Sequence, residues 1–132
     1  MKHPNIVCLF GVYTKEPFVC LVMELAEEGS LYNLLHCNPL IGYTTGHAMS
    51  WVKQCAEGVA HLHAMKPRPV VHRDLKSLNL LRFKGCTVIK ICDFGTATEL
   101  KTLMTSTNGT VAYMAPEVGF GFQYSVRNKN KD

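Results

Sequence analysis

The sequence contains no uninterrupted apolar stretch of about 18 residues, the length that a membrane-spanning helix needs. Its first ten residues, MKHPNIVCLF, carry one lysine followed shortly by a proline, which is not the layout of a secretory signal peptide. These two absences predict a soluble, cytoplasmic chain that does not insert into a membrane.

Charge is also scarce, because charged residues make up 18% of the chain and the formal net charge is only +4. Basic residues do not alternate with aromatic ones along one face, as a nucleic-acid-binding surface would require, so no nucleic-acid partner is expected. The mild positive charge favours acidic or phosphorylated protein partners. A length of 132 residues with 47% hydrophobic residues predicts a single globular unit with one core.

The six cysteines occur singly, and no CxxC pair is present. Disulfides and a zinc site are therefore the less favoured alternatives, and the His61-x-His63 pair also lacks zinc-ligand spacing. The favoured interpretation is that the cysteines are reduced thiols that pack as small hydrophobic side chains in the core.

Hydrophobic spacing predicts both strands and helices. Two short apolar runs, 6–10 and 18–23, are typical of a buried antiparallel hairpin. Ser30 is placed to cap a short helix that carries Leu31, Leu34 and Leu35. Apolar residues then recur at steps of three and four between Thr44 and Met65, which predicts the longest helix.

The second half of the chain changes character. The stretches VVHRDL, LNLLRF and TVIKIC predict short β-type segments joined by tight turns. Residues 93–117 are rich in Thr, Ser, Gly and Asn and show little periodicity, which predicts a long loop. Long loops in compact domains usually carry function.

Three short motifs follow one another in the second half of the chain. They are His72-Arg73-Asp74 with Lys76 and Asn79, then Asp93-Phe94-Gly95, then Ala115-Pro116-Glu117. In this order the chain resembles the eukaryotic protein kinases, which carry HRDxKxxN, DFG and APE. The resemblance implies an α+β, incomplete protein-kinase-like fold, with the end of the small lobe, the hinge and the first part of the helical large lobe. It assigns residues 1–125 to a partial catalytic domain and 126–132 to a short basic tail.

Phosphoryl transfer from ATP explains why these residue types occur together. The carboxylate of Asp93 and the amide oxygen of Asn79 are suitable Mg²⁺ ligands, and Mg²⁺ neutralises and aligns the phosphate oxygens. Asp74 would accept the proton of the attacking hydroxyl. Lys76 would place a positive charge on the transferring phosphoryl group, and its position implies the Ser/Thr-specific form.

The resemblance also assigns a site for the adenine base. Met23 corresponds to the gatekeeper, and Glu24, Leu25 and Ala26 to the hinge whose backbone pairs with adenine. Leu81 would form the apolar floor. Cys92 would face the pocket beside the metal ligands, where burial and a nearby negative charge should raise the pKa of its thiol.

Other residues around the site receive structural or regulatory interpretations. His72 is expected to be a buried residue that packs beneath Phe94 and takes no part in catalysis. Arg73 is either a structural ion-pair residue or a ligand for a phosphate on the 93–117 loop. The loop threonines that match the family's phosphorylation sites are Thr96, Thr102 and Thr105. Thr110 is expected to be a hydrogen-bonding residue of the substrate platform.

Three longer stretches, LVMELAEEGSLYNLLH, HAMSWVKQCAEGVAHLH and IKICDFGTATELKT, resemble the TGF-beta-activated group of MAP kinase kinase kinases. This resemblance runs from His3 to about Ser125. It implies a cytoplasmic Ser/Thr kinase that acts on MAP kinase kinases, autophosphorylates its activation loop and binds regulatory subunits.

The match stops near both ends of the sequence. No residue before His3 corresponds to the Gly-rich loop or to the phosphate-binding lysine, and the tail VRNKNKD departs from the family pattern. We therefore expect weak Mg·ATP binding by this chain alone, and a stripe including Trp51, Val52, Cys55 and Val59 that faces water. Two alternatives stay open, namely a catalytically incompetent kinase-like binding module and a fragment without a stable fold.

Overall fold

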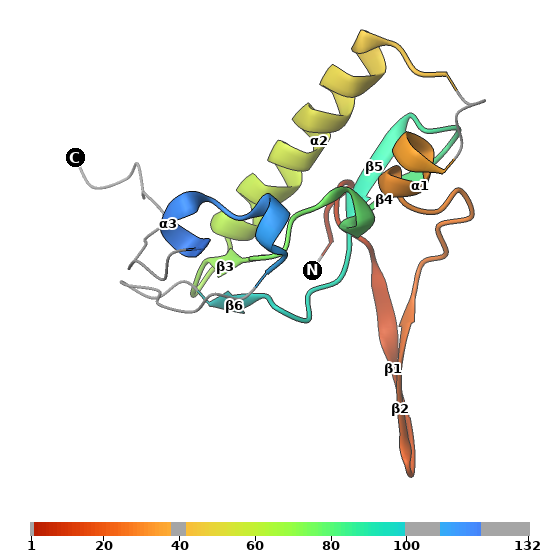
Figure 1. Cartoon of the computed structure of the whole chain (residues 1–132). Helices are drawn as coiled ribbons and strands as arrows, with labels where there is room; N and C mark the ends of the chain where they lie inside the picture. The colour runs from red at the N-terminus through yellow and green to blue at the C-terminus, as the bar shows by residue number, and fades with distance from the viewer. Residues whose placement is uncertain (1, 38–41, 100–108, 120–132) are drawn as a thin grey trace.

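The computed structural model describes residues 2–37, 42–99 and 109–119, and Figure 1 shows how their elements are arranged. The predicted tail 126–132 lies outside these residues. The elements in chain order are β1 (Leu9–Lys15), β2 (Phe18–Met23), α1 (Leu31–His36), α2 (Thr45–His63), β3 (Val70–Val71), η1 (Ser77–Asn79), β4 (Leu80–Phe83), β5 (Val88–Ile91), β6 (Thr98–Glu99), η2 (Val111–Tyr113) and α3 (Pro116–Gly119). This mixture of helices and small sheets agrees with the predicted α+β kinase-like class.

Strands β1 and β2 form the expected antiparallel hairpin, but β1 covers Leu9–Lys15 and so overlaps only the end of the predicted run 6–10. Lys15 lies opposite Phe18 and Gly11 opposite Val22, and an irregularity between Gly11 and Leu9 precedes the Leu9–Met23 pair. The expectation of burial is right for Ile6 and Val7, which precede β1, and wrong for the two strands themselves. Figure 1 shows the hairpin extending away from the rest of the molecule, and Phe18 and Val19 are 68% and 71% exposed. Periodicity revealed the strands but not their burial, because burial depends on what packs against them.

Side-chain caps begin both longer helices. The Ser30 hydroxyl accepts a hydrogen bond from the Asn33 amide at 3.3 Å and so starts α1. At the start of α2, the Thr44 hydroxyl accepts from the His47 amide at 3.3 Å, and the His47 ring accepts from the Thr44 amide at 3.1 Å. Such reciprocal bonds satisfy amides that otherwise lack partners in the first turn. Both helices occur where the sequence predicts them.

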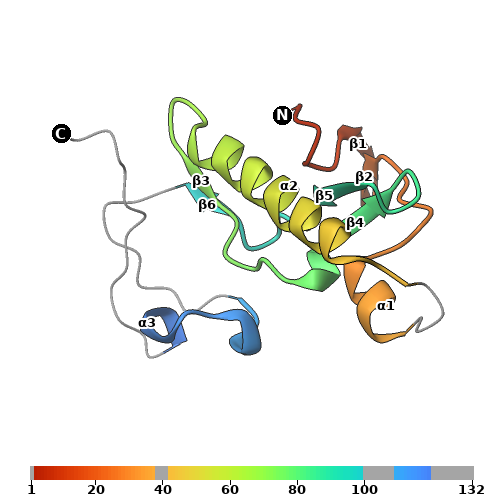
Figure 2. The same ribbon diagram turned by 90° about the horizontal axis from the view of Figure 1, so that it is seen from above.

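Helix α2 packs against β5 and β3, and Figure 2 shows it running along these strands. The core cluster joins Leu31, Leu34, Trp51 and Ile89, and the Trp51 indole donates to the Cys86 carbonyl at 2.8 Å. The expectation of a water-facing stripe on α2 is therefore only partly right. Trp51 is 4% exposed, whereas Val52 is 67% exposed.

The strands pair as three separate two-stranded sheets, β1–β2, β3–β6 and β4–β5. Residues 72–75, expected to continue a strand, instead leave β3 as an irregular loop. The predicted long loop 93–117 contains β6, η2 and the start of α3. Strand β6 forms because it pairs with β3. A two-residue strand has too little sequence to produce a recognisable pattern.

All six cysteines are free, and Cys20 and Cys37 are exposed while the other four are partly buried. The expectation that they fill the core is therefore too strong. Within the described part of the chain, no helix combines the length and the apolar character that crossing a membrane demands.

The N-terminal segment runs against β5 and fixes how closely α2 approaches. The Ile91 amide donates to the Asn5 carbonyl at 2.9 Å, and the Val7 amide donates to the Ile91 carbonyl at 2.9 Å. Gly58 of α2 faces this junction, where an added Cβ would lie 2.8 Å from Ile91 Cδ1 and 2.9 Å from the Asn5 carbonyl oxygen. A larger side chain would therefore push the helix away from backbone atoms.

We predict that Gly58→Ala lowers the free energy of unfolding by about 1 to 2 kcal/mol, because overpacking outweighs the helix propensity gained by alanine. Urea denaturation with an unchanged m-value measures the effect. Gly46→Ala in the first turn of α2 is the matched control, because its nearest atom is the Thr44 hydroxyl oxygen at 3.4 Å. Equal stabilisation by both substitutions would contradict the close contact at Gly58.

Candidate active site

The loop from His72 to Asn79 joins β3 to β4 and is organised around a buried imidazole. His72 is 2% exposed, and its ring lies edge-on to Phe94 with 5.1 Å between centroids. Its Nδ1 accepts from the Asp74 amide at 3.3 Å, which leaves the proton on Nε2 to donate to the Cys92 carbonyl at 2.9 Å. Both ring nitrogens are therefore hydrogen-bonded, in agreement with the packing role expected for His72.

The residue before Asp93 is bonded to this loop through both of its backbone groups. The Cys92 carbonyl accepts from His72, and the Cys92 amide donates to the Asn79 carbonyl at 2.9 Å. These bonds place the start of the Asp93 loop beside the loop that carries Asp74 and Asn79. Asp93 has a positive φ of 60°, which is uncommon outside glycine and turns the chain sharply at this point.

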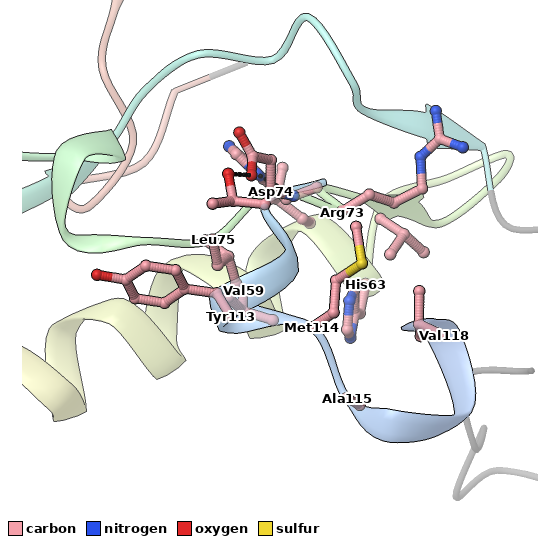
Figure 3. Close-up of a pocket in the computed structure, with 13 residues that line it drawn as sticks. Val59, His63, Arg73, Asp74, Leu75, Tyr113, Met114, Ala115 and Val118 are labelled. Atoms are coloured by element: carbon pink, nitrogen blue, oxygen red, sulfur yellow. Dashed lines mark hydrogen bonds between the residues drawn. The ribbon is translucent and has the colours of Figure 1, made fainter. Parts of the chain in front are cut away.

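Asp74, Lys76 and Thr110 form a closed polar triangle. Lys76 Nζ lies 2.8 Å from Asp74 Oδ2 and donates to the Thr110 hydroxyl at 2.8 Å. The Thr110 hydroxyl in turn donates to Asp74 Oδ1 at 2.7 Å, the bond drawn in Figure 3. The side chains of Lys76 and Asp74 are only 19% and 10% exposed, so both charges are held in fixed positions. The structure thus brings together the predicted proton acceptor, the predicted cation and the predicted platform residue.

These contacts lower the pKa of Asp74, chiefly through the hydrogen bond from Lys76 and then through that from Thr110, while partial burial acts in the opposite direction. Asp74 is therefore a carboxylate at neutral pH. A carboxylate with a lowered pKa is a weak base, so it is better suited to orienting a hydroxyl than to removing its proton early in a reaction.

Asn79 lies directly beside this triangle. Its amide nitrogen donates to the Asp74 carbonyl at 2.9 Å and to Asp74 Oδ2 at 3.3 Å, and the side chain is buried. Because the nitrogen makes both bonds, the amide oxygen is directed to the other side and can serve as a ligand. The exposed Asp93 carboxylate accepts from the Gly95 amide at 3.2 Å. One amide oxygen and one carboxylate fit Mg²⁺, which usually takes few protein ligands together with phosphate oxygens.

The predicted adenine-binding segment lies at the base of the hairpin. Met23 ends β2 and is half exposed, and Leu25 is 78% exposed. The Glu24 amide donates to the Cys8 carbonyl at 3.0 Å, and the Ala26 carbonyl accepts from the Gly29 amide at 3.2 Å. Adenine pairing would therefore use the remaining backbone groups of this segment, including the Glu24 carbonyl.

Leu81, the predicted floor, lies on β4 next to this segment. It pairs with Lys90 of β5 and forms a bridge with Ser30. Cys92 is partly buried, and burial followed by the Asp93 charge raises the pKa of its thiol to about 11. The thiol is thus protonated and slow to react at neutral pH, as its expected surroundings suggested.

The predicted regulatory residues fall into two groups. Arg73 Nε donates to the Thr96 carbonyl at 2.6 Å, and the Thr96 hydroxyl donates to the His72 carbonyl at 2.9 Å. In this conformation Thr96 therefore helps to hold the 72–79 loop. Its phosphorylation, and phosphate binding by Arg73, stay predictions. Thr102 and Thr105 lie outside the described residues.

A cavity of about 310 Å³ is lined in part by Asp74 and Thr110, and Figure 3 draws the residues around it. Its lining is largely apolar and includes Val59, Met114 and Val118, so it does not suit a triphosphate. Sequence reasoning missed this cavity, since its walls come from α2, β3 and the 110–118 segment.

Sequence reasoning also missed two contacts near the site. Gly109 has a φ of 132°, and a Cβ there would lie 2.5 Å from the Arg73 carbonyl oxygen. Only glycine allows the 109–113 segment to approach the 72–79 loop this closely. The second contact is an ion pair between Glu24 and Lys90. A lysine within the apolar run VIKIC was the available signal for it.

We predict that Lys76→Met raises the pKa of Asp74, because the largest contribution to its lowering is lost. Thr110→Val should raise it less. Because the folded-state pKa lies below the ordinary value of 3.8, the pair stabilises the fold above that pH, and the stabilisation disappears as the pH falls through the folded-state pKa. Carboxyl NMR titration measures the shifts, with Lys53→Met on the exposed face of α2 as the control. An unchanged Asp74 titration in Lys76→Met would contradict the triangle.

Comparison with known proteins agrees with this geometry. The family model described as "Protein kinase domain" matches residues 1–129. Bovine mitogen-activated protein kinase kinase kinase 7 is 57% identical over 128 residues, covering 96% of this chain and 22% of the relative. The Drosophila melanogaster protein of the same name is 50% identical over 127 residues, covering 96% of this chain and 19% of the relative.

A more distant relative is human mitogen-activated protein kinase kinase kinase 10, which is 39% identical over 140 aligned positions, covering all of this chain and 14% of the relative. The chain thus spans between 14% and 22% of the length of these relatives. The matched region nevertheless contains the triangle, the metal-ligand candidates and the hinge, and from the breadth of the match we conclude that this chain belongs to the protein kinase family.

Proposed function

We propose that the protein containing this chain is a serine/threonine protein kinase of the MAP kinase kinase kinase type, which uses ATP and Mg²⁺. The observation that carries the proposal is the Asp74 carboxylate, held at 2.8 Å by Lys76 and at 2.7 Å by Thr110, with Asn79 bonded to it. A carboxylate held in this way suits the positioning of a protein hydroxyl for attack on a phosphoryl group.

In the proposed reaction, the substrate hydroxyl donates a hydrogen bond to Asp74 while its oxygen attacks the γ-phosphorus of ATP. The new oxygen–phosphorus bond forms as the bond from the γ-phosphorus to the bridging oxygen breaks, and ADP leaves with that electron pair. Because the pKa of Asp74 is low, proton transfer comes late, after the hydroxyl oxygen has begun to bond to phosphorus. Lys76 Nζ, 2.8 Å from Asp74, can stabilise negative charge on the transferring group.

Asn79 and Asp93 would hold Mg²⁺, which when bound offsets the negative charge of the phosphate oxygens. The link between Cys92 and the 72–79 loop supports this assignment, because it keeps the two ligands on neighbouring segments. The backbone of Glu24, Leu25 and Ala26 would bind the adenine, with Met23 behind it and Leu81 below it.

The proposed substrate class rests on the names of the relatives. Their printed names describe kinases of MAP kinase kinases, and we extend that substrate class to this protein. Regulatory subunits, a cytoplasmic location and phosphorylation of Thr96, Thr102 or Thr105 belong to the same proposal.

We predict that Asp74→Asn in the full-length protein lowers phosphate transfer to a MAP kinase kinase by about 10²- to 10⁴-fold, the usual contribution of a positioned acid or base. Initial rates with radiolabelled ATP measure the loss, and phosphoamino-acid analysis should find phosphoserine and phosphothreonine. Glu57→Gln is the control, because Glu57 forms an exposed pair with Lys53 on α2. Equal incorporation by Asp74→Asn would show that the activity comes from a contaminant. An inactive but folded wild-type protein would favour the non-catalytic binding module.

A further inference from the structure

The side chain of Glu24 makes contacts that its expected role in the hinge does not require. One carboxylate oxygen, Oε1, accepts from the Cys8 amide at 2.6 Å, and the other, Oε2, accepts from Lys90 Nζ at 2.6 Å. The Glu24 and Lys90 side chains are only 18% and 19% exposed. The carboxylate therefore joins the hinge to both the start of β1 and the middle of β5.

Lys90 is held from a second direction. Its Nζ lies 4.7 Å from the centre of the Phe83 ring, a favourable arrangement of a cation over an aromatic face. Removing two charges from water costs free energy, and this cost offsets much of their attraction. A mostly buried ion pair therefore does not by itself stabilise the fold much. What the pair does provide is a fixed separation, because both carboxylate oxygens and the ammonium group are committed to specific partners.

The two residues of the pair lie near opposite ends of the proposed nucleotide site. Glu24 belongs to the segment that would bind the adenine, and Lys90 lies in β5 two residues before Cys92. Cys92 is bonded through both backbone groups to the catalytic loop and immediately precedes Asp93. The pair thus connects the base end of the proposed nucleotide site to its metal end by way of one short strand.

We propose that the Glu24–Lys90 ion pair is a positioning device that sets the distance between the hinge and the metal ligand Asp93. This inference rests on the proposed function, because it assumes that one nucleotide spans both ends. Glu24 and Lys90 are positioning residues and do not touch the reacting atoms. A ligand that contacts both ends should sense their separation, whereas a ligand that contacts one end should not.

Comparing these two kinds of ligand distinguishes a positioning role of the pair from a general effect on the stability of the fold. Mg·ATP reaches from the hinge to Asp93, while adenosine reaches only the hinge. In the full-length protein, Lys90→Met should weaken Mg·ATP binding about tenfold and adenosine binding less than about twofold, as isothermal calorimetry measures. The KM for ATP should rise more than kcat falls. Lys90→Arg, which keeps the charge, should restore most of the Mg·ATP affinity.

A double-mutant cycle tests whether the two residues act through each other. Glu24→Gln keeps an acceptor for the Cys8 amide but removes the charge, so adding it to Lys90→Met should cause little further loss of Mg·ATP affinity. The matched control is Arg68–Glu99, also joined at 2.6 Å but with side chains 69% and 55% exposed. Arg68→Met should leave the ratio of the two affinities unchanged. If Lys90→Met does not fold, Glu24→Gln alone serves as the test. It should weaken Mg·ATP binding more than adenosine binding.

The outcomes distinguish this inference from the proposed function. Wild-type protein that binds neither Mg·ATP nor adenosine overturns both. Wild-type protein that binds both ligands, with equal losses for the two in Lys90→Met or with additive losses in the cycle, overturns the positioning role and leaves the proposed function standing. A selective loss for Mg·ATP that Lys90→Arg reverses supports the inference.

Discussion

The backbone hydrogen bonds of Cys92 hold the parts of the candidate site together. Its carbonyl accepts from the buried His72 ring, and its amide donates to the Asn79 carbonyl. These two bonds join segments separated by a strand, a turn and a second strand. The His72 ring takes part through Nε2, while its Nδ1 accepts from the Asp74 amide. Together with the pairing of Leu80 and Ile91 in β4 and β5, the two Cys92 bonds keep the start of the Asp93 loop beside the loop that carries Asp74 and Asn79.

The charged side chains near Cys92 form two compact clusters. At one end, Lys76 and Thr110 hold the Asp74 carboxylate in its ionised form. At the other, Glu24 in the predicted hinge pairs with Lys90. In both clusters each charged group has an opposite charge and a further hydrogen-bond or aromatic partner, as partly buried ions need. Fixed charges of this kind favour a reaction whose main requirement is the alignment and neutralisation of phosphate oxygens.

Local signals in the sequence were sufficient for part of this structure. Ser30 and Thr44 begin helices because a cap acts within one turn. The packing of His72 against Phe94 was implied by the resemblance to the protein kinases, and the structure confirms it. Contacts between distant residues were not predictable in this way. Glu24 and Lys90 are 66 positions apart, and the contact of Gly109 with Arg73 depends on backbone shape. The hairpin shows the same limit, since alternation predicts a strand but not what covers it.

The central claim is that Asn79 and Asp93 share a metal next to Asp74. Replacing Mg²⁺ by paramagnetic Mn²⁺ in the presence of ADP, and recording amide NMR spectra of the full-length protein, tests it directly. The account predicts strong broadening for residues 74–79 and 93–95, and none for the start of α2 near Thr45. Broadening of only one of the two loops, or sharp signals from both in protein saturated with Mn·ADP, would contradict it.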